Sequence, residues 1–286
     1  MIYIREDLQD IFPRSWSVDD FLSIEGEVVK QVVVERKTFS FERHGRSFFL
    51  KAHFGVGWKE IWKNLLQLRL PVLGARNEWE GIRALKRLSI PTMKVAAFGQ
   101  EGRNPARMKS FIITDALQYT EDLESWLPTL TENYGHHVVL PLKWSIIRDV
   151  ALISRKLHSN GINHRDFYLC HLRIDLSSVA QEAEQPRIYV MDLHRVAIRR
   201  QTPSRWVIKD IAGLLYSALH APRKINLTRN DFLRFVSVYD DLCWRQSLIK
   251  NRYFWQKVLR RVIHTHRRGS ASGSALPAYM NYWLEQ

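Results

Sequence analysis

Residues 161–172 of this chain read GINHRDFYLCHL, and they follow a run at 142–160 whose apolar residues have helical spacing. The tripeptide His164-Arg165-Asp166 after a helix is typical of the catalytic loop of kinase-fold enzymes, where the aspartate orients the hydroxyl that receives a phosphoryl group. Three residues can recur by chance, so the motif needs partners elsewhere in the chain. A phosphate-binding lysine should precede it, and a metal-binding aspartate should follow it.

A candidate phosphate-binding lysine lies upstream, at the end of a predicted strand. Residues 47–51 read SFFLK, and a turn-like segment at 43–46 connects them to another β-prone run at 38–42. Two such runs joined by a short turn that contains glycine predict a β-hairpin. Lys51 would then end the third strand of an N-terminal sheet, where the lysine of a kinase fold holds the α- and β-phosphates of ATP.

In a kinase fold the ammonium of this lysine is oriented by a glutamate on the next helix. Glu78 is the best candidate, because Ile82 and Leu85 follow it on one apolar stripe of a predicted helix. Glu80 is the alternative. Lys51 and Glu78 are therefore the predicted nucleotide-binding pair.

A metal-binding carboxylate is predicted downstream of the catalytic loop. An apolar, strand-like run at 188–191 ends in Asp192. In kinase-fold enzymes an aspartate after such a strand holds the magnesium ion that bridges the phosphates. Asp192 is therefore the predicted metal ligand.

Each of these residues, taken singly, has an ordinary structural explanation. A lysine at a strand end is often a solvated charge, a helix glutamate is often exposed, and an aspartate after a strand often caps the next turn. The combination is more informative, because lysine, glutamate, His-Arg-Asp and strand-ending aspartate occur in the order that phosphoryl transfer requires. Together they predict a kinase fold with Asp166 as the catalytic residue.

Several segments outside the general kinase motifs point to a particular family. They are LKAH at 50–53, NLL at 64–66, RLPVLGA at 69–75, SFIIT at 110–114, NHRD at 163–166 with Tyr168 and the Cys-His pair at 170–171, and DLHR at 192–195. In these segments, from about Gly26 to Asp210, the chain resembles the lipopolysaccharide core heptose(I) kinases of Gram-negative bacteria. The Cys-His pair and the PVLGA segment are not general kinase features, so the resemblance is more specific than the motif alone.

The resemblance implies ATP-dependent phosphorylation of the first heptose of the lipopolysaccharide inner core, at its 4-hydroxyl. It also implies a cytoplasmic enzyme that acts on a membrane-embedded glycolipid. The catalytic motifs predict ATP and Mg²⁺ as cofactors. Lys51 would fix the phosphates, Asp192 would hold the metal, and Asp166 would accept the proton of the sugar hydroxyl.

Two features depart from the general kinase pattern. The phosphate-covering loop has a single glycine, Gly26, so phosphate binding must rely on Lys51 and metal, with Lys30 or Arg36 as candidate helpers. His171 stands where kinases usually carry a metal-binding asparagine, and Mg²⁺ prefers oxygen ligands to imidazole. If His171 is a metal ligand, it binds through water or favours Mn²⁺. A structural role is the alternative.

These patterns predict an α+β, two-lobed, protein-kinase-like fold with an antiparallel N-lobe sheet, one main N-lobe helix and a mostly helical C-lobe. The 286 residues suit a single kinase-like domain over 1–286, with the N-lobe at 20–114 and the C-lobe at 115–286. A hinge at 115–117 would border the adenine. The predicted N-lobe strands lie near 28–35, 37–43, 47–53, 94–99 and 109–114.

In the C-lobe, a helix is predicted at 142–160 with Gly161 as its stop. Residues 172–174 and 188–190 predict a small hairpin. Asp210 resembles the buried aspartate that braces the catalytic loop of kinase folds, and a simple helix N-terminal charge is the alternative. A surface loop is predicted at 177–185 and a flexible linker at 269–274.

The formal net charge of +14 indicates an anionic partner. Nucleic acid is not favoured, because no Cys/His finger spacing, helix-turn-helix or aromatic RNA signature is present. Residues 242–276 combine arginines, lysines and aromatic residues without an acidic one, and 57–66 places Trp58, Trp62 and Leu65 on one helical face. The predicted contact is an anionic membrane surface. Packing of both apolar stripes on the core is the alternative.

Composition also bears on the compartment. The two cysteines, Cys170 and Cys243, imply no disulfide framework and suit a reducing environment. Charged residues at 5–7 interrupt the N-terminus before a signal-peptide apolar region could form, and no run approaches the length of a membrane span. We expect a cytoplasmic protein, peripheral on the cytoplasmic face of the inner membrane.

Other functions remain open at this stage. A protein kinase needs a long activation segment, and the short distance from Asp192 to the next predicted helix argues against one. An aminoglycoside- or choline-kinase-like enzyme usually surrounds a cationic substrate with acidic residues, whereas this chain is basic. A non-catalytic kinase-like scaffold would use the basic C-terminal helical segment, but the presence of Lys51, Asp166 and Asp192 argues against lost catalysis.

Overall fold

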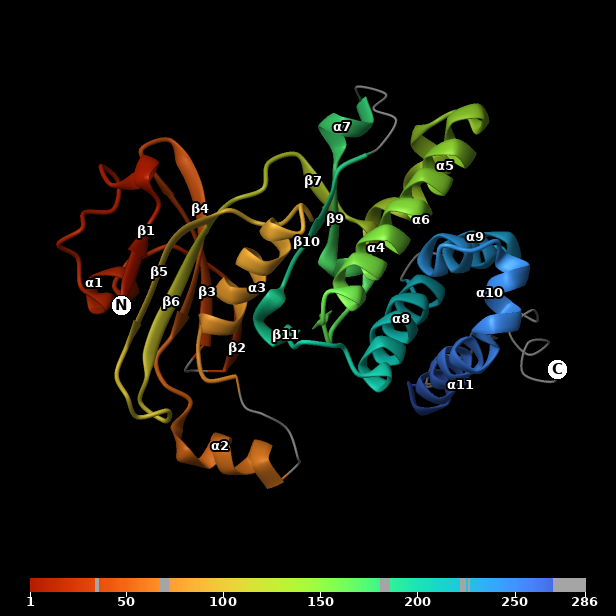
Figure 1. The fold of residues 1–286 in the computed structure, drawn as a ribbon. Coiled ribbons are helices and arrows are strands. Elements are labelled where there is room, and N and C mark those ends of the chain that lie inside the picture. The colour runs from red at the N-terminus through yellow and green to blue at the C-terminus, as the bar shows by residue number, and fades with distance from the viewer. Residues whose placement is uncertain (34–35, 67–71, 181–185, 222–224, 226, 270–286) are drawn as a thin grey trace. The chain divides into compact units, whose positions relative to one another are not determined.

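The computed structural model describes residues 1–33, 36–66, 72–180, 186–221, 225 and 227–269 (Figure 1). The chain divides into two compact units. The N-terminal unit comprises Met1–Gln118 and Asp192–Val196, and the C-terminal unit comprises Tyr119–Met191 and Ala197–Gln286. The segment that begins with Asp192 therefore belongs to the N-terminal unit, although it follows the catalytic loop in the sequence.

The N-terminal unit is built on a six-stranded antiparallel sheet of order β1-β5-β6-β4-β3-β2 (Figure 1). Its strands are β1 (Ile2–Ile4), β2 (Glu27–Val33), β3 (Arg36–Arg43), β4 (Arg46–His53), β5 (Val95–Glu101) and β6 (Lys109–Asp115). The helices of this unit are η1 (Glu6–Leu8), α1 (Val18–Leu22), α2 (Gly57–Leu66), α3 (Arg76–Arg87) and η4 (Leu193–Arg195). The five predicted strands are confirmed, except that residues 34–35 lie outside the described residues.

The two faces of this sheet have different roles. Side chains alternate along a strand, so Leu50 and Ala52 of β4 point to one face while Lys51 points to the other. Leu50 and Ala52 belong to a buried cluster that also contains Phe12 and Phe21 from the N-terminal segment. The N-terminal residues thus cover the first face, and the second face is left to carry the lysine. The sequence analysis did not anticipate β1 or this cover.

Helix α3 lies on the lysine-bearing face. Trp79 of α3 stacks on Phe98 of β5, with ring centroids 4.4 Å apart and an interplanar angle of 2°. Ile82 and Leu85 are buried on the same helix, as the apolar stripe predicted. Gly81 leaves room for the segment after Asp192, because a Cβ there would lie 3.1 Å from Leu193. The helix is therefore packed between the sheet and that segment.

The C-terminal unit is mostly helical, with two small sheets of order β10-β9-β7 and β11-β8. Its strands are β7 (Thr120–Asp122), β8 (Ile162–Asn163), β9 (Leu172–Asp175), β10 (Ile188–Val190) and β11 (Ala197–Ile198). Its α-helices are α4 (Leu123–Trp126), α5 (Leu130–Asn133), α6 (His136–Ser159), α7 (Leu176–Ala180), α8 (Ser204–Leu219), α9 (Arg229–Asp240), α10 (Trp244–Lys250) and α11 (Arg252–Gly269), and its short 3-10 helices are η2 (Leu127–Thr129) and η3 (Leu169–His171). The predicted β9–β10 hairpin is confirmed.

The structure corrects one C-terminal prediction and decides between two alternatives for another. The surface loop predicted at 177–185 begins as helix α7, which Asp175 supports by accepting the Ser177 N–H at 3.0 Å, while residues 181–185 lie outside the described residues. The apolar stripe of α11 packs on the core, because Trp255 and Val258 are buried in a cluster with α8 and α9. That stripe is thus not available to lipid. In the predicted 269–274 linker, residues 270–274 lie outside the described residues.

Candidate active site

Lys51 lies in an ion-paired cluster within the N-terminal unit. Its Nζ donates to Glu78 Oε1 at 2.6 Å and lies 3.5 Å from Asp192 Oδ1. Glu78 is 1% exposed, whereas the side chain of Glu80 is 43% exposed and pairs with Arg76 at 2.8 Å. The predicted pairing of Lys51 with Glu78 rather than with Glu80 is confirmed.

Two opposing effects determine the charge of Lys51. Burial alone would lower the pKa of the ammonium, but the carboxylates of Glu78 and Asp192 outweigh burial and raise the pKa above its ordinary value. Arg36 acts in the opposite direction, because its positive charge disfavours a second cation nearby. Lys51 is therefore a firmly protonated cation, as a phosphate ligand must be.

Asp192 has an unusual backbone conformation. Its φ of 55° and ψ of 55° place it in the left-handed region, which costs a non-glycine residue on the order of 1 kcal/mol or more. His194 Nδ1 donates to Asp192 Oδ1 at 2.5 Å, and the Nζ of Lys51 lies 3.5 Å from the same oxygen. The strained residue is thus held by two hydrogen-bonding or charged neighbours. Such strain is concentrated at functional sites.

The predicted hinge is tied to the N-terminal unit by its own contacts. Asp115 forms an ion pair with Arg5, whose Nη1 and Nη2 lie 2.9 Å and 3.1 Å from the two carboxylate oxygens. The N–H of Ala116 donates to the carbonyl of Ser47 at 3.0 Å. The Ala116 N–H is therefore already used, and an adenine would have to bind other backbone groups of this segment.

In the C-terminal unit, one buried carboxylate clamps the catalytic loop. Asp210 Oδ2 accepts the backbone N–H of His164 at 2.6 Å, and Oδ1 accepts that of Arg165 at 2.8 Å. Asp210 is 1% exposed and lies in the middle of α8, not at its start. The bracing role predicted for Asp210 is confirmed, and the helix N-terminal alternative is wrong.

A glycine directs the chain from α6 into this loop. Gly161 has a φ of +75°, and a Cβ at this position would lie 1.8 Å from the carbonyl oxygen of Arg199. Its own carbonyl accepts the Arg199 N–H at 2.9 Å. The predicted stop after α6 therefore has two causes, a left-handed turn and a close approach of backbone.

The catalytic candidate Asp166 lies among basic groups of the same unit. Lys209 of α8 places its Nζ 3.8 Å from Asp166 Oδ1 and also donates to the carbonyl of Arg165. His171 Nδ1 donates to the backbone carbonyl of Asp166 at 2.7 Å. His164 is fully buried and contacts the carbonyl of Met191 through Nε2 at 2.8 Å. The loop is thus fixed at several points around Asp166.

Comparison with known proteins places the chain in a family. The model of the lipopolysaccharide kinase (Kdo/WaaP) family matches residues 19–239, which is most of the chain. The chain belongs to this family.

Members of the family with curated names are similar over nearly the whole chain. The lipopolysaccharide core heptose(I) kinase WaaP of Escherichia coli strain K12 is 40% identical over 248 residues, which cover 87% of this chain and 90% of the relative. The kinase of the same name from Pseudomonas aeruginosa is 41% identical over 241 residues, covering 82% and 86%. A solved structure of WaaP in complex with acyl carrier protein matches with a TM-score of 0.75 and 31% identity, covering 92% of this chain and 98% of that one. The predicted kinase-like fold is confirmed.

The metal prediction can be tested against the donor atoms present. Among the described residues, no group of three or more His, Cys, Asp or Glu side chains forms a preassembled metal site. Mg²⁺ in kinases is held by one or two carboxylates, ATP oxygens and waters, so the carboxylate of Asp192 suits it. His171 offers an imidazole nitrogen, which Mg²⁺ takes reluctantly. The donor set fits a Mg²⁺ that arrives with ATP, and a ligand role for His171 stays a prediction.

Sequence reasoning missed two residues of these kinase-family clusters, Lys209 and His194. Both are adjacent to or within segments that the motifs had marked, since Lys209 precedes Asp210 and His194 lies two positions after Asp192. No pattern assigned them a role, because their contacts depend on packing. Of the two candidate phosphate helpers, Arg36 lies near Lys51 in the N-terminal unit, while the Lys30 side chain lies outside the described part of the structure.

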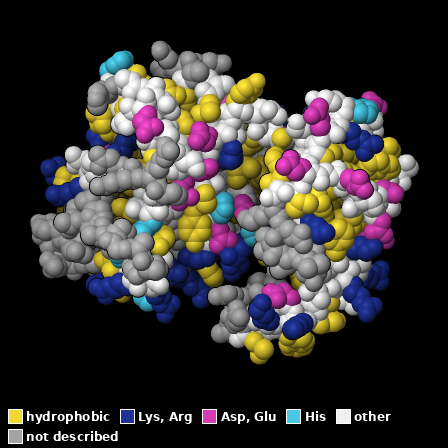
Figure 2. Space-filling model, turned by 180° about the vertical axis from the view of Figure 1, so that it is seen from behind, with side chains coloured by type: hydrophobic (Ala, Val, Ile, Leu, Met, Phe, Trp, Pro, Cys, Tyr) yellow, Lys and Arg dark blue, Asp and Glu magenta, His cyan; other side chains and the backbone are white. Residues whose placement is uncertain are grey.

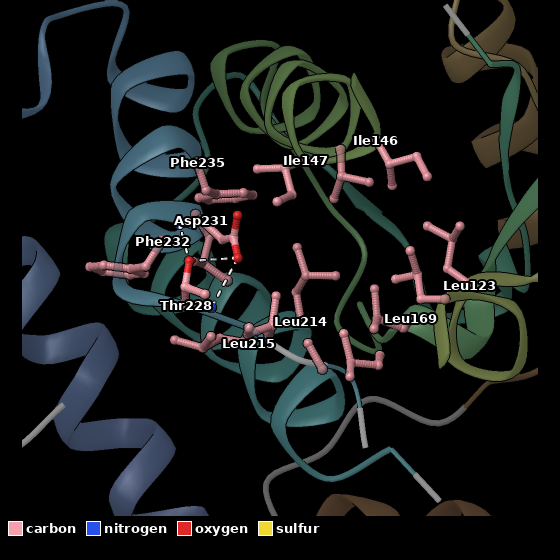
Figure 3. Close-up of a pocket in the computed structure, with 16 residues that line it drawn as sticks. Leu123, Ile146, Ile147, Leu169, Leu214, Leu215, Thr228, Asp231, Phe232 and Phe235 are labelled. Carbon is pink, nitrogen blue, oxygen red and sulfur yellow. Dashed lines mark hydrogen bonds between the residues drawn. The ribbon is translucent and has the colours of Figure 1, made fainter. Parts of the chain in front are cut away.

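The C-terminal unit also contains a narrow apolar pocket of ≈100 Å³ (Figure 3). Aliphatic and aromatic side chains from α4, α6, α8 and α9 line it, among them Ile147, Leu214 and Phe235. Its acidic residue, Asp231, forms a capping box with Thr228 and accepts a hydrogen bond from Lys143 Nζ at 2.6 Å. The ammonium and the Thr228 hydrogen bonds outweigh burial and lower the pKa of Asp231. The pocket therefore suits an apolar ligand.

The exposed face of α2 differs from that of α11. Trp58 and Trp62 are 51% and 58% exposed, and Leu66 is exposed as well. In Figure 2, α2 lies at the lower right, where hydrophobic side chains and Lys or Arg side chains are both at the surface. No helix in the described ranges is long and apolar enough to cross a membrane. The apolar face of α2 is thus a surface feature.

Proposed function

We propose that this protein transfers the γ-phosphate of ATP to the 4-hydroxyl of the first heptose of the lipopolysaccharide inner core. The observation that carries the proposal is the Lys51–Glu78–Asp192 cluster, found in a chain that belongs to the Kdo/WaaP family. The curated relatives that cover more than four fifths of this chain are named heptose(I) kinases. The acceptor sugar follows from their names, the 4-hydroxyl from the family resemblance of the sequence, and the predicted chemistry from the residues.

In the proposed mechanism, charge is neutralised by groups that are already positioned. Lys51, oriented by Glu78, binds the ATP phosphates, and Asp192 is the carboxylate that would hold Mg²⁺. When bound, the metal supplies positive charge to the phosphate oxygens. Preorganised cations lower the barrier because phosphoryl transfer spreads negative charge over those oxygens.

On the acceptor side, Asp166 orients the sugar hydroxyl and accepts its proton. Lys209 of the same unit places its Nζ 3.8 Å from Asp166 Oδ1. Asp210 acts on the loop by holding two backbone N–H groups, so we assign it a positioning role. His164 and Arg165 would then tether the loop without contacting the substrate, which Asp166 contacts.

The test is transfer from labelled ATP to purified inner-core lipopolysaccharide that lacks this phosphate. Wild type and Asp166→Ala are compared, with aminoglycosides and a generic protein as rival acceptors. We expect labelled heptose with wild type and none with the variant. Transfer only to a rival acceptor would contradict the proposed substrate but not the kinase activity. ATP binding without transfer to any acceptor would favour a non-catalytic, kinase-like scaffold over an enzyme.

We further propose that this chain binds an acyl carrier protein, because a solved structure of its relative WaaP is a complex with acyl carrier protein. Acyl carrier proteins present a fatty acyl chain, and the apolar pocket between α6, α8 and α9 offers a lining of matching chemistry. The test compares acylated with unacylated carrier protein in a thermal-shift and co-elution experiment. A larger stabilisation by the acylated form is expected. Equal stabilisation by the two forms would exclude the pocket as the binding site of the acyl chain.

We also propose that α2 makes the contact with the membrane in which the glycolipid is embedded. Helix α2 carries exposed tryptophans beside Lys59 and Lys63, and this composition is typical of helices that lie on the surface of anionic membranes. A peripheral position on the cytoplasmic face would follow. Sedimentation with anionic liposomes at low salt should fall for the Trp58→Ser, Trp62→Ser double variant, and unchanged binding would contradict a role for α2.

A further inference from the structure

The C-terminal unit has a polar cavity of ≈390 Å³ beside the catalytic loop. Its walls come from four parts of the chain: Glu124 of α4, Tyr168 before η3, Lys209 and Tyr216 of α8, and Arg261 of α11. A volume above about 300 Å³ is in the range of small-molecule sites. None of the described catalytic contacts requires a cavity in this place.

The cavity adjoins the catalytic carboxylate through Lys209. This lysine lines the cavity, and its Nζ lies 3.8 Å from Asp166 Oδ1. A ligand that fills the cavity therefore reaches the neighbourhood of the group that would activate the acceptor hydroxyl. The adjacent portion of the acceptor is the natural occupant, because it is covalently connected to that hydroxyl.

The aromatic wall of the cavity is held by packing and hydrogen bonds. Gly213 allows Tyr168 to lie directly on α8, since a Cβ there would be 3.2 Å from the Tyr168 ring. The ring of His220 stacks on Tyr216 with centroids 4.2 Å apart. His220 Nδ1 donates to the Tyr216 carbonyl, and its Nε2 accepts from His266 Nδ1 at 2.7 Å. Preformed aromatic faces of this kind suit the apolar faces of sugar rings.

The charges of the cavity favour an anion. Lys209 and Arg261 line it. Lys209 already lies 3.8 Å from Asp166, whereas Arg261 has no carboxylate within ion-pairing distance among the described residues. The acidic member of the lining is Glu124, and burial together with the charge of Asp122 raises its pKa. Burial and these same carboxylates raise the pKa of Cys170 to about 11, so its thiol stays protonated. The guanidinium of Arg261, an acceptor for hydroxyl groups and aromatic faces together match an acidic saccharide.

We propose that this cavity binds the part of the acceptor glycan next to the phosphorylated sugar, and that Arg261 selects an anionic group on it. This inference rests on the proposed function and adds the specificity-determining residue and the chemical class it recognises. The anionic group can be a sugar carboxylate or a phosphate, since a guanidinium binds both in the same bidentate manner.

The test compares Arg261→Gln with Arg260→Gln, its exposed neighbour on α11, which does not line the cavity. Loss of a charge-assisted hydrogen bond corresponds to about tenfold weaker binding or more. We expect Arg261→Gln to raise KM for the glycolipid about tenfold, with kcat and KM for ATP close to wild type. Arg260→Gln should behave as wild type, and Arg261→Lys should recover part of the loss. Melting temperatures confirm that each variant is folded.

Modified acceptors identify the anion. One preparation has its carboxylates converted to neutral amides, and another has its phosphates removed. The difference between wild type and Arg261→Gln should disappear with the preparation that lacks the recognised group. Equal KM values for the two arginine variants, or a difference that persists with both preparations, would overturn the inference. Absence of transfer by wild type would instead contradict the proposed function.

Discussion

The two units hold their predicted active-site residues by different means. In the N-terminal unit, Lys51 is directed by side-chain charges, with Glu78 at 2.6 Å and Asp192 at 3.5 Å. In the C-terminal unit, the loop that carries Asp166 is directed through its backbone, because Asp210 accepts two consecutive N–H groups. One unit positions a side chain, and the other positions a segment of chain.

This difference predicts different costs of damage. A lysine that loses one carboxylate still has a second one nearby, so the fold of the N-terminal unit should tolerate the loss while phosphate binding weakens. A clamped loop that loses its acceptor leaves two backbone N–H groups without their partner, and buried N–H groups are costly to leave unpaired. The C-terminal unit should therefore lose stability and activity together.

The largest effect is expected from Asp166→Ala, which removes the proposed base without touching either clamp. Turnover should fall roughly 10²–10⁴-fold, the usual scale for loss of a general base. Binding of ATP, measured by calorimetry, should stay near the wild-type value because Lys51 and Asp192 are unchanged. A variant with near-wild-type turnover would remove Asp166 from the mechanism.

Asp210→Asn should have the next largest effect. Asparagine keeps one acceptor oxygen but places an NH₂ where the second N–H needs an acceptor, so the free energy of unfolding should fall by about 1–3 kcal/mol. Turnover should fall as well, because the loop that carries Asp166 loses one anchor. Denaturant melts and initial rates measure the two quantities. Loss of turnover at unchanged stability would show that Asp210 acts chemically and is not a clamp.

Glu78→Gln should affect ATP more than the fold. The amide can still accept from Lys51, but the charge that orients the ammonium is gone, so KM for ATP should rise about tenfold. Glu80→Gln is the matched control, since Glu80 lies on the same helix but pairs with Arg76. Equal KM values for the two variants would refute the role of Glu78 as the partner of Lys51.

At neutral pH the smallest effect is expected at His53, which shares the lysine-bearing face of β4. Burial, with the charges of Arg36, Lys51 and His194, lowers its pKa from 6.5 to about 3. Above pH 6.5 the imidazole is neutral in both states. As the pH falls below 6.5, the unfolded chain gains a proton that the native state refuses, and stability falls by about 1.4 kcal/mol per pH unit.

His53→Gln should therefore flatten the dependence of the unfolding free energy on pH between about 6 and 4. Urea melts across this range measure the slope, and His44→Asn, at an exposed turn position, is the control. The same slope in His53→Gln and wild type would show that His53 is protonated in the native state.

Local patterns predicted the elements that carry the chemistry. Alternating apolar residues placed β4 and hence Lys51, and the His-Arg-Asp motif after a helix placed Asp166. These signals are local, because strand alternation and turn residues act over a few positions. The faces of amphipathic helices were harder to predict. The sequence patterns of α2 and α11 are similar, yet Trp58 is exposed and Trp255 is buried.

The sequence by itself determined the order of Lys51, Asp166 and Asp192, and with it the prediction of a kinase-like fold, since motif spacing and strand periodicity are properties of the chain. The sequence favoured Glu78 with Glu80 as the alternative, and only the tertiary structure settled that Glu78 meets Lys51, because the two glutamates lie roughly 160° apart around one helix and only one can face the sheet. The tertiary structure also brought Lys209 to Asp166 and Arg261 to the polar cavity. Such contacts join segments far apart in sequence, and their energies depend on burial and distance, which no local pattern contains.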